Sequence, residues 1–252
     1  ITLNDDVTPE NIEFLIQCYQ AIGLQNVKEP IYRAMNQLIV LQQGAPYAGW
    51  ADQYYVEDMK PAHARSYEPR SINAGTTVRA IHLLMDYYRL TGETKFLAGI
   101  PAAIQYLESM ELPAEEARKY GYTGNGRQGI LVPRFVDPDT GKPLYVHRVG
   151  SNVANGHYYT DQNITNTIAH YSSGAFIDIA SLKSAYNEIR TKPVEELIKD
   201  SPLLSTEQVP LPRFYTRIFS RGGDKGGDVM QVVRSLTKEG YWLTPLQQIS
   251  NP

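Results

Sequence analysis

The first 110 residues alternate between stretches with apolar side chains at helical spacing and short polar breaks. From Thr8 to Gly23 an apolar residue recurs every three or four positions, which predicts an amphipathic helix with Thr8 as its N-cap and Gly23 as its end. The same pattern predicts three further helices, at about 27–43, 77–90 and 96–110.

These four predicted helices form two similar pairs. Shifting the chain by 69 residues places Thr8 on Thr77 and Gly23 on Gly92, and it also superimposes the two apolar stripes. The matches fall on the cap, the stripe and the turn, which specify a helical hairpin. Stacked hairpins of this kind predict an all-α fold, an (α/α) toroid or incomplete α/α barrel with its long loops gathered at one end.

Beyond residue 112 the pattern changes to turn residues and short alternating stretches, such as 144–148. These predict loops and short β-strands that decorate the helical body. A further helix is expected at 179–189 with Asp178 as its N-cap.

The C-terminal part is expected to close the fold without forming a second large domain. A helix is predicted at 228–238, and the Pro- and Gly-rich stretch 191–227 is expected to wrap the surface. We therefore expect one toroid domain over residues 1–252, with 191–252 as its wrapping segment and last helix.

The stretch 50–71, between the two hairpins, concentrates charged and aromatic residues. Gly49, Pro61 and Pro69 exclude a continuous helix through it. Such a loop is not expected in the core, so it is either a solvated connector or the wall of a site for a polar ligand.

Composition narrows the classes of partner. The 252 residues carry a net charge of −3, so the sequence lacks the excess of positive charge with which proteins bind nucleic acid or an anionic membrane. No apolar run approaches the roughly 18 residues of a membrane span. The single cysteine, Cys18, excludes an intrachain disulfide and a Cys-based metal cluster, and we expect it to be a buried, inert thiol.

Several ordered motifs resemble polysaccharide lyase family 10, the pectate lyases with an α/α toroid, and most closely its bacterial branch. The matching stretches are 1–6 (ITLNDD), 61–69 (PAHARSYEP), 133–143 (PRFVDPDTGKP) with Arg148 after it, and 240–246 (GYWLTPL). Compared with that family the chain lacks an upstream hairpin, so we expect a toroid without its N-terminal hairpin.

The resemblance implies β-elimination on polygalacturonate, the acidic polysaccharide of pectin. A base removes the C5 proton of a galacturonate, Ca²⁺ bound together with the substrate neutralises the adjacent carboxylate, and the 4-linked sugar leaves. It also implies a monomeric bacterial protein that is secreted or periplasmic.

The resemblance assigns roles residue by residue. Arg134 matches the family's Arg-Phe-Tyr-Asp motif and is expected to be the catalytic base. Because a guanidinium is always charged in proteins, Lys142 and Tyr67 remain alternative bases. Oxygen ligands suit Ca²⁺ and guanidinium groups suit uronates. The expected calcium ligands are Asp5, Asp6 and Asp52, and the expected substrate-binding residues are Arg65, Glu68, Lys142, Arg148, Trp50 and Tyr67.

One departure from the family pattern leaves the activity open. Tyr55 stands where the family has an acid, and a phenol with a pKa near 10 does not replace a carboxylate as a calcium ligand. Asp52, Glu57 or Asp58 would have to compensate; otherwise calcium use has changed or activity is lost.

Two other functions therefore remain as alternatives. One is a catalytically impaired homologue that binds acidic polysaccharide. The other is an α/α-toroid glycoside hydrolase, which needs two carboxylates about 5–10 Å apart across a cleft. Its acids would come from Asp52, Asp58 and Glu68.

Overall fold

The computed structural model describes residues 1–119, 129–150, 156–168, 173–205 and 237–238. The chain divides into two compact units, 1–210 and 211–252, and all the elements described below belong to the first. Among the described residues no helix is long and apolar enough to cross a membrane.

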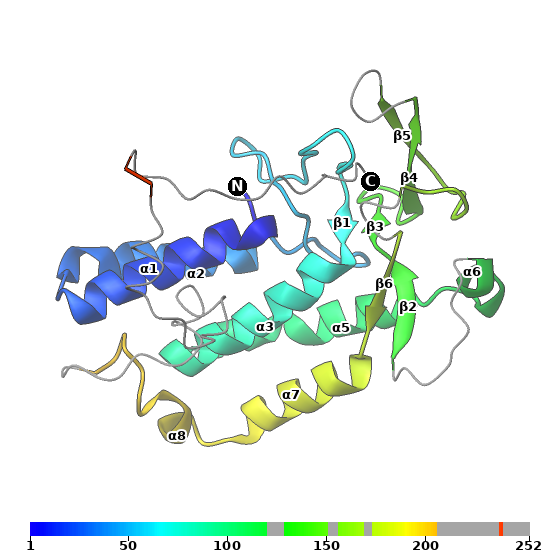
Figure 1. Ribbon diagram of the computed structural model, residues 1–252. Helices are drawn as coiled ribbons and strands as arrows, with labels where there is room; N and C mark the ends of the chain where they lie inside the picture. Colours follow the sequence, from blue (N-terminus) through cyan, green and yellow to red (C-terminus); the bar gives the residue numbers. More distant parts are fainter. Residues whose placement is uncertain (120–128, 151–155, 169–172, 206–236, 239–252) are drawn as a thin grey trace. The chain divides into compact units, whose positions relative to one another are not determined.

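The N-terminal half is helical, as the periodicity predicts. Its main helices are α1 (Val7–Ala21), α2 (Lys28–Val40), α3 (Ala74–Thr91), α4 (Lys95–Ala98) and α5 (Ile100–Ser109), with 3₁₀ turns at Asn4–Asp6 and Gln25–Val27. Figure 1 shows α1 beside α2, and α3 beside α5. The two predicted hairpins are thus present, and α2 contacts α3 between them.

The second hairpin differs from the first because its returning helix is broken. The pattern predicts one helix over 96–110, whereas α4 ends at Ala98 and α5 starts at Ile100. Pro101 stands in the first turn of α5, where its missing N–H is tolerated. Gln42 fills the break by donating a hydrogen bond from Nε2 to the Gly99 carbonyl at 3.0 Å.

Helix α3 is the central helix of this unit. Apolar residues around most of its circumference are buried, which is typical of a helix that is covered on several sides. It contacts α2, α4, α5 and α8 (Val194–Ile198), and it also contacts strands β1 and β6. The first turn of α3 is therefore fixed firmly in the fold.

The fold class predicted from sequence is wrong: the protein is a mixed α/β structure, not an all-α toroid. The described strands are β1 (Ile72–Asn73), β2 (Ile130–Pro133), β3 (Phe135–Val136), β4 (Pro143–Val149), β5 (His157–Asp161) and β6 (Gly174–Ile177). They form an antiparallel four-stranded sheet in the order β1-β3-β4-β5 and a two-stranded sheet β2-β6.

The strands β1, β2 and β3 belong to the core, whereas β5 is exposed along most of its length. Strand β1 immediately precedes α3 and pairs with β3, with Ile72 opposite Val136 and Asn73 opposite Phe135. Phe135 and Val136 are buried. The error arises because this pairing joins residues more than sixty positions apart, which local periodicity cannot show.

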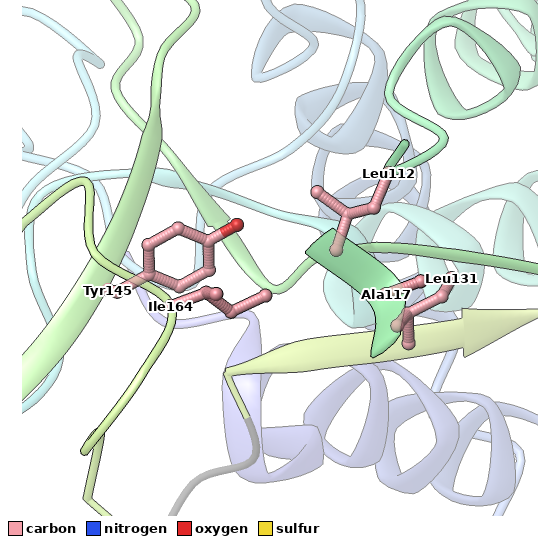
Figure 2. Packing of buried hydrophobic residues seen from close by; sticks show 5 residues of the cluster. All are labelled: Leu112, Ala117, Leu131, Tyr145 and Ile164. Carbon is pink, nitrogen blue, oxygen red and sulfur yellow. The ribbon is translucent and has the colours of Figure 1, made fainter. Parts of the chain in front are cut away.

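A small apolar cluster joins the sheets to the short helix α6 (Ala114–Lys119). It consists of Leu112, Ala117, Leu131, Tyr145 and Ile164, which Figure 2 shows. Tyr145 lies inside β4 and is 1% exposed. Burial raises the pKa of its hydroxyl to about 12, so the ring enters the core as a neutral phenol.

The loop 50–71 is partly core, contrary to the expectation from its composition. Trp50 is fully buried and donates a hydrogen bond from Nε1 to the Leu38 carbonyl at 2.8 Å. Tyr54 is also buried, and its hydroxyl accepts a hydrogen bond from the backbone N–H of Ala51 at 2.7 Å. Trp50 thus holds the loop against α2, and Tyr54 fixes the loop on itself.

The later helix prediction is confirmed at α7 (Ile179–Thr191). Asp178 caps this helix by accepting a hydrogen bond from the N–H of Ser181 at 2.9 Å. Helix α8 lies within the stretch expected to wrap the surface, while the predicted helix at 228–238 falls almost wholly outside the described residues. Cys18 is half-buried.

Candidate functional site

A polar pocket of about 120 Å³ lies where the loop 50–71, the start of α3 and the link between β2 and β3 meet. Residues from four separate parts of the chain line it: Asn4, Asp5, Asp52, Glu68, Asn73, Gly75, Thr76, Arg79 and Arg134. Most of these side chains are charged or amide groups, so the pocket suits a polar ligand.

The N-terminus of α3 forms one wall of the pocket. Asn73 caps the helix: its side-chain oxygen accepts hydrogen bonds from the N–H groups of Gly75 at 2.8 Å and Thr76 at 3.3 Å. The positive end of the helix dipole therefore faces the pocket and favours an anion there.

Asp52 connects the loop to this cap. Asn73 donates a hydrogen bond from Nδ2 to Asp52 Oδ2 at 2.8 Å, and the Thr76 hydroxyl donates to Oδ1. Burial raises the pKa of the Asp52 carboxyl and the nearby Glu68 adds to the rise, against the opposing effects of the two hydrogen bonds and of Arg134. Asp52 is thus a desolvated carboxylate held beside a guanidinium.

Arg134 is fixed through its backbone in the one-residue link between β2 and β3. Its N–H donates to the Ser173 carbonyl at 2.8 Å, and its carbonyl accepts from the N–H of Ala74, the first residue of α3, at 2.9 Å. These two bonds place the Arg134 side chain at the pocket next to the helix N-terminus.

An ion-pair network closes the side of the pocket formed by the loop. Glu68 is 3% exposed and accepts two hydrogen bonds from Arg65, one from the backbone N–H at 3.0 Å and one from Nη1 at 2.8 Å. Arg65 Nη2 also donates to Asp5 Oδ2 at 3.0 Å. The two carboxylates raise the pKa of Arg65, so this guanidinium stays charged.

Arg79 is a pocket residue that the sequence analysis did not single out. Its Nη1 lies 3.2 Å from Asp6 Oδ1. A signal was available, because Arg79 follows Gly75 and Thr76 by four and three positions and so shares their helix face. With Arg134 it gives the pocket two guanidinium groups.

The backbone of Asp5 and Asp6 is strained. Both residues adopt left-handed conformations, with φ of 54° and 58°. Each such residue costs about 1 kcal/mol or more, although Asp tolerates the region better than most residues. The geometry places these neighbouring carboxylates against two different cations, Arg65 and Arg79.

Other predicted substrate-binding residues lie around or away from the pocket. Tyr67 makes an edge-to-face contact with Tyr158 of β5, with ring centroids 5.6 Å apart. Tyr158 pairs in register with Arg148, so the Arg148 side chain projects from the same sheet face. Lys142 is exposed in the turn before β4 and is not among the pocket-lining residues. Trp50 offers no ring surface to a ligand, because it is fully buried.

The three acids that could replace the carboxylate missing at Tyr55 differ in whether they line the pocket. Tyr55 is 44% exposed and does not line the pocket. Glu57 and Asp58 are exposed and are also absent from its lining. Asp52 alone of the three candidate acids lines the pocket.

The predicted calcium ligands do not form a shared metal site in this geometry. Within the described ranges, no group of three or more His, Cys, Asp or Glu side chains is arranged to hold a metal ion. Asp5 and Asp6 pair with arginines, and both Asp52 oxygens accept hydrogen bonds from protein groups. In the free protein these carboxylates thus have protein partners, and calcium binding together with the substrate stays a prediction.

Most of the residues that line this pocket lie in a segment that matches a known protein family. Residues 40–164 match the model of the family described as pectic acid lyase. No curated protein matches the chain. The matched segment runs from the end of α2 past β5 and carries every pocket-lining residue except Asn4 and Asp5. At this coarse level, residues 40–164 are similar to the pectic acid lyases, which are lyases acting on a polysaccharide.

Proposed function

We propose that this protein is a pectate lyase of polysaccharide lyase family 10 type, which cleaves polygalacturonate by β-elimination at the pocket around Arg134. The observation that carries the proposal is the placement of Arg79, Arg134 and the N-terminus of α3 around one pocket, within the segment that resembles the pectic acid lyases.

The charges of the pocket suit a uronate. A guanidinium binds a carboxylate through paired hydrogen bonds, and the positive end of a helix dipole favours an anion beside it. In the free protein Asp6 pairs with Arg79, and Asp5 pairs with Arg65. We infer that substrate carboxylates replace these aspartates as partners of the two arginines.

β-Elimination requires a cation beside the uronate carboxylate and a base beside the C5 proton. Neutralising the uronate carboxylate acidifies the C5 proton; after its removal the electron pair forms the C4–C5 double bond, and the C4–O bond breaks. We assign the proton removal to Arg134, since the alternatives Lys142 and Tyr67 do not line the pocket. To accept the C5 proton this guanidinium must first release its own proton to water, which exclusion of water by the bound substrate and the second pocket cation, Arg79, would favour. The leaving oxygen takes a proton from water or from a pocket group.

No step of the reaction is assigned to a calcium ion, because Asp5 and Asp6 pair with arginines and both Asp52 oxygens accept hydrogen bonds from protein groups. Calcium dependence stays a prediction and is tested by running the assay with added Ca²⁺ and with a chelator. Because a polymer does not cross a membrane, we further propose that the protein acts outside the cytoplasm, secreted or periplasmic.

The test is an assay of polygalacturonate cleavage, in which the 4,5-unsaturated product is measured by its ultraviolet absorbance. Arg134→Ala is expected to lower turnover by about a hundredfold or more, the usual contribution of a positioned proton-transfer group. Arg79→Gln is expected to weaken substrate binding by about tenfold, the value of one hydrogen bond to a charged group. Arg89→Gln, in the last turn of α3, is the matched control and leaves both quantities unchanged.

The outcomes separate this proposal from its rivals. Binding of polygalacturonate without the unsaturated product indicates the catalytically impaired homologue. New reducing ends without the chromophore indicate a hydrolase; of its three candidate acids, Asp52 and Glu68 line the pocket. Wild-type turnover by the Arg134→Ala variant removes the assignment of that residue.

A further inference from the structure

A second pocket, of about 370 Å³, lies on the opposite side of the β1–β3 pair from the arginine pocket. Successive side chains of a strand point to opposite faces. In β1, Asn73 lines the arginine pocket, whereas Ile72 packs with Ala48 and Tyr106 beside the second pocket. Val136, which pairs with Ile72, lines the second pocket.

The lining of this second pocket is mixed, with polar groups beside apolar and aromatic side chains. Its residues are Pro46, Tyr47, Tyr106, Ser109, Met110, Glu111, Leu112, Pro113, Glu116, Pro133, Val136, Gly141 and Pro143. Leu112 also belongs to the apolar cluster that Figure 2 shows. The volume lies in the lower part of the range for small-molecule sites, about 300–1,000 Å³, which fits a ligand of one or two rings.

The half-buried ring of Tyr47 is held in a fixed position by its neighbours. It meets the Tyr106 ring edge-on, with the centroids 6.5 Å apart and the planes at 65°. On another side it packs against Gly141, where a Cβ atom would lie only 2.3 Å from Tyr47 Cε1. Gly141 has a φ of 69° in the tight turn that follows β3, so the ring rests on backbone. A rigid ring of this kind is a suitable stacking surface.

Tyr106 brings an unused hydrogen-bonding group to this pocket. The residue is 4% exposed, and among the described residues its hydroxyl has no hydrogen-bond partner. Buried polar groups normally have a partner. Burial raises the pKa of this hydroxyl, so it is a neutral phenol that can donate a hydrogen bond.

Charge decides which class of ligand fits. The charged residues that line the second pocket are Glu111 and Glu116, and no Lys, Arg or His is among its lining residues. Two carboxylates repel a uronate but accept hydrogen bonds from hydroxyl groups. An ammonium ligand would suit the carboxylates, yet it offers no acceptor to Tyr106. A neutral sugar offers donors, acceptors and a ring face together.

We propose that the pocket between Tyr47, Tyr106 and Glu116 is a binding site for an uncharged sugar unit, separate from the arginine pocket. The sugar ring stacks on Tyr47, its hydroxyls donate to the glutamates, and one of its oxygens accepts from Tyr106. This inference does not depend on the lyase activity.

The test uses two tetrasaccharides that differ in charge, 1,4-linked galactotetraose and tetragalacturonate, with binding measured by titration calorimetry. Tyr47→Ala is expected to weaken galactotetraose binding by about tenfold, the scale of a lost aromatic contact with its hydrogen bonds. The same variant leaves tetragalacturonate binding unchanged. Arg79→Gln is expected to show the reverse pattern.

Two further variants separate binding from folding. Tyr47→Phe keeps the ring and is expected to retain galactotetraose binding. Tyr106→Phe removes the unpartnered hydroxyl, so it is expected to weaken binding while leaving the melting temperature of the free protein equal or higher. Failure of galactotetraose to bind, equal binding by Tyr47→Ala and wild type, or displacement by a simple alkylammonium salt would overturn the proposal.

Discussion

At the scale of single residues, the pocket is governed by how its charges are paired. Arg65 and Arg79 each hold an aspartate from the strained turn before α1. The two oxygens of Asp52 are held by the uncharged groups of Asn73 and Thr76, with Arg134 near enough to lower its pKa only in part against burial. Asp52 is therefore the pocket acid for which burial makes ionisation unfavourable in the folded protein.

The pH dependence of stability tests the state of Asp52. The pKa of Asp52 is raised in the folded protein, chiefly by burial. At a pH between the unfolded and the folded pKa, the native state therefore binds more protons than the unfolded chain. The stability contribution is fully present below the unfolded pKa of about 3.9 and is lost as the pH rises through the folded pKa. Relative to wild type, Asp52→Asn should become more stable as the pH is raised from 4 toward 7, as measured by denaturant unfolding at each pH.

Asp139 is the matched control for that experiment. Its bidentate pair with Arg70, at 2.7 and 3.0 Å, lowers its pKa. The folded state then binds fewer protons than the unfolded chain, so Asp139→Asn should show the opposite trend with pH. The same sign for both variants would show that burial does not dominate at Asp52.

Residue roles were partly predictable from the sequence. The motif containing Arg65 and Glu68 forms one hydrogen-bonded unit, as expected for residues close in sequence. Trp50 was expected to bind substrate, in a loop not expected in the core, but its indole N–H donates to a helix carbonyl inside the core. Local sequence cannot show which side of a loop packs inward.

At the scale of elements, the first turn of α3 organises the site. Asn73 caps this helix and also donates to Asp52, while the N–H of Ala74 holds the Arg134 backbone. One helix start thus connects three lining residues from distant parts of the chain. Displacing the cap should disturb all three.

The variant Asn73→Ala tests this connection. Loss of an N-cap costs about 1 kcal/mol, and a desolvated carboxylate that loses one donor costs about 1–3 kcal/mol more. We expect the free energy of unfolding to fall by about 2–4 kcal/mol, measured by chemical denaturation.

Asp178→Ala removes the cap of α7 and serves as the comparison. Asp178 is exposed and bonds Ser181 of its own helix, so only the cap contribution of about 1 kcal/mol should be lost. Equal losses in the two variants would mean that the Asn73–Asp52 bond adds no stability.

Helices and sheets differed in how well the sequence predicted them. The periodic patterns predict α1, α2, α3 and α7 closely, because helical hydrogen bonds join residues four apart. The predicted caps Thr8 and Thr77 are wrong, since Asp6 precedes α1 and Asn73 caps α3. The pairings β1–β3 and β2–β6 were missed because the partners lie far apart along the chain. The break between α4 and α5 was also missed; there Gln42, from the segment after α2, binds the Gly99 carbonyl.

At the scale of the whole first unit, the β1–β3 pair separates an arginine-rich pocket from an aromatic one. The segment before β1 is packed tightly at Gly49. A Cβ atom there would lie 2.6 Å from Ile72 Cγ2, 2.7 Å from Thr77 Oγ1 and 2.9 Å from Tyr106 Cε1. The loop, β1, α3 and α5 therefore meet at a position with no room for a methyl group.

Gly49→Ala should consequently destabilise the fold. Overpacking of this kind costs about 1–3 kcal/mol, which thermal or denaturant unfolding would detect. Gly44→Ala is the control, because nothing lies within 4 Å of its Cβ position; its effect should stay within about 0.5 kcal/mol. Similar effects of the two variants would show that the junction can relax.

The sequence by itself determined the helices of the two hairpins, the cap of α7 and the motifs that carry the resemblance to the pectate lyases, because each depends on residues near one another in the chain. Only the tertiary structure decided that the fold is mixed α/β, that Asp52 and not Tyr55, Glu57 or Asp58 lies in the pocket, and that Arg79 joins Arg134 there. These features depend on pairing and packing between distant segments, whose free energy no local pattern records.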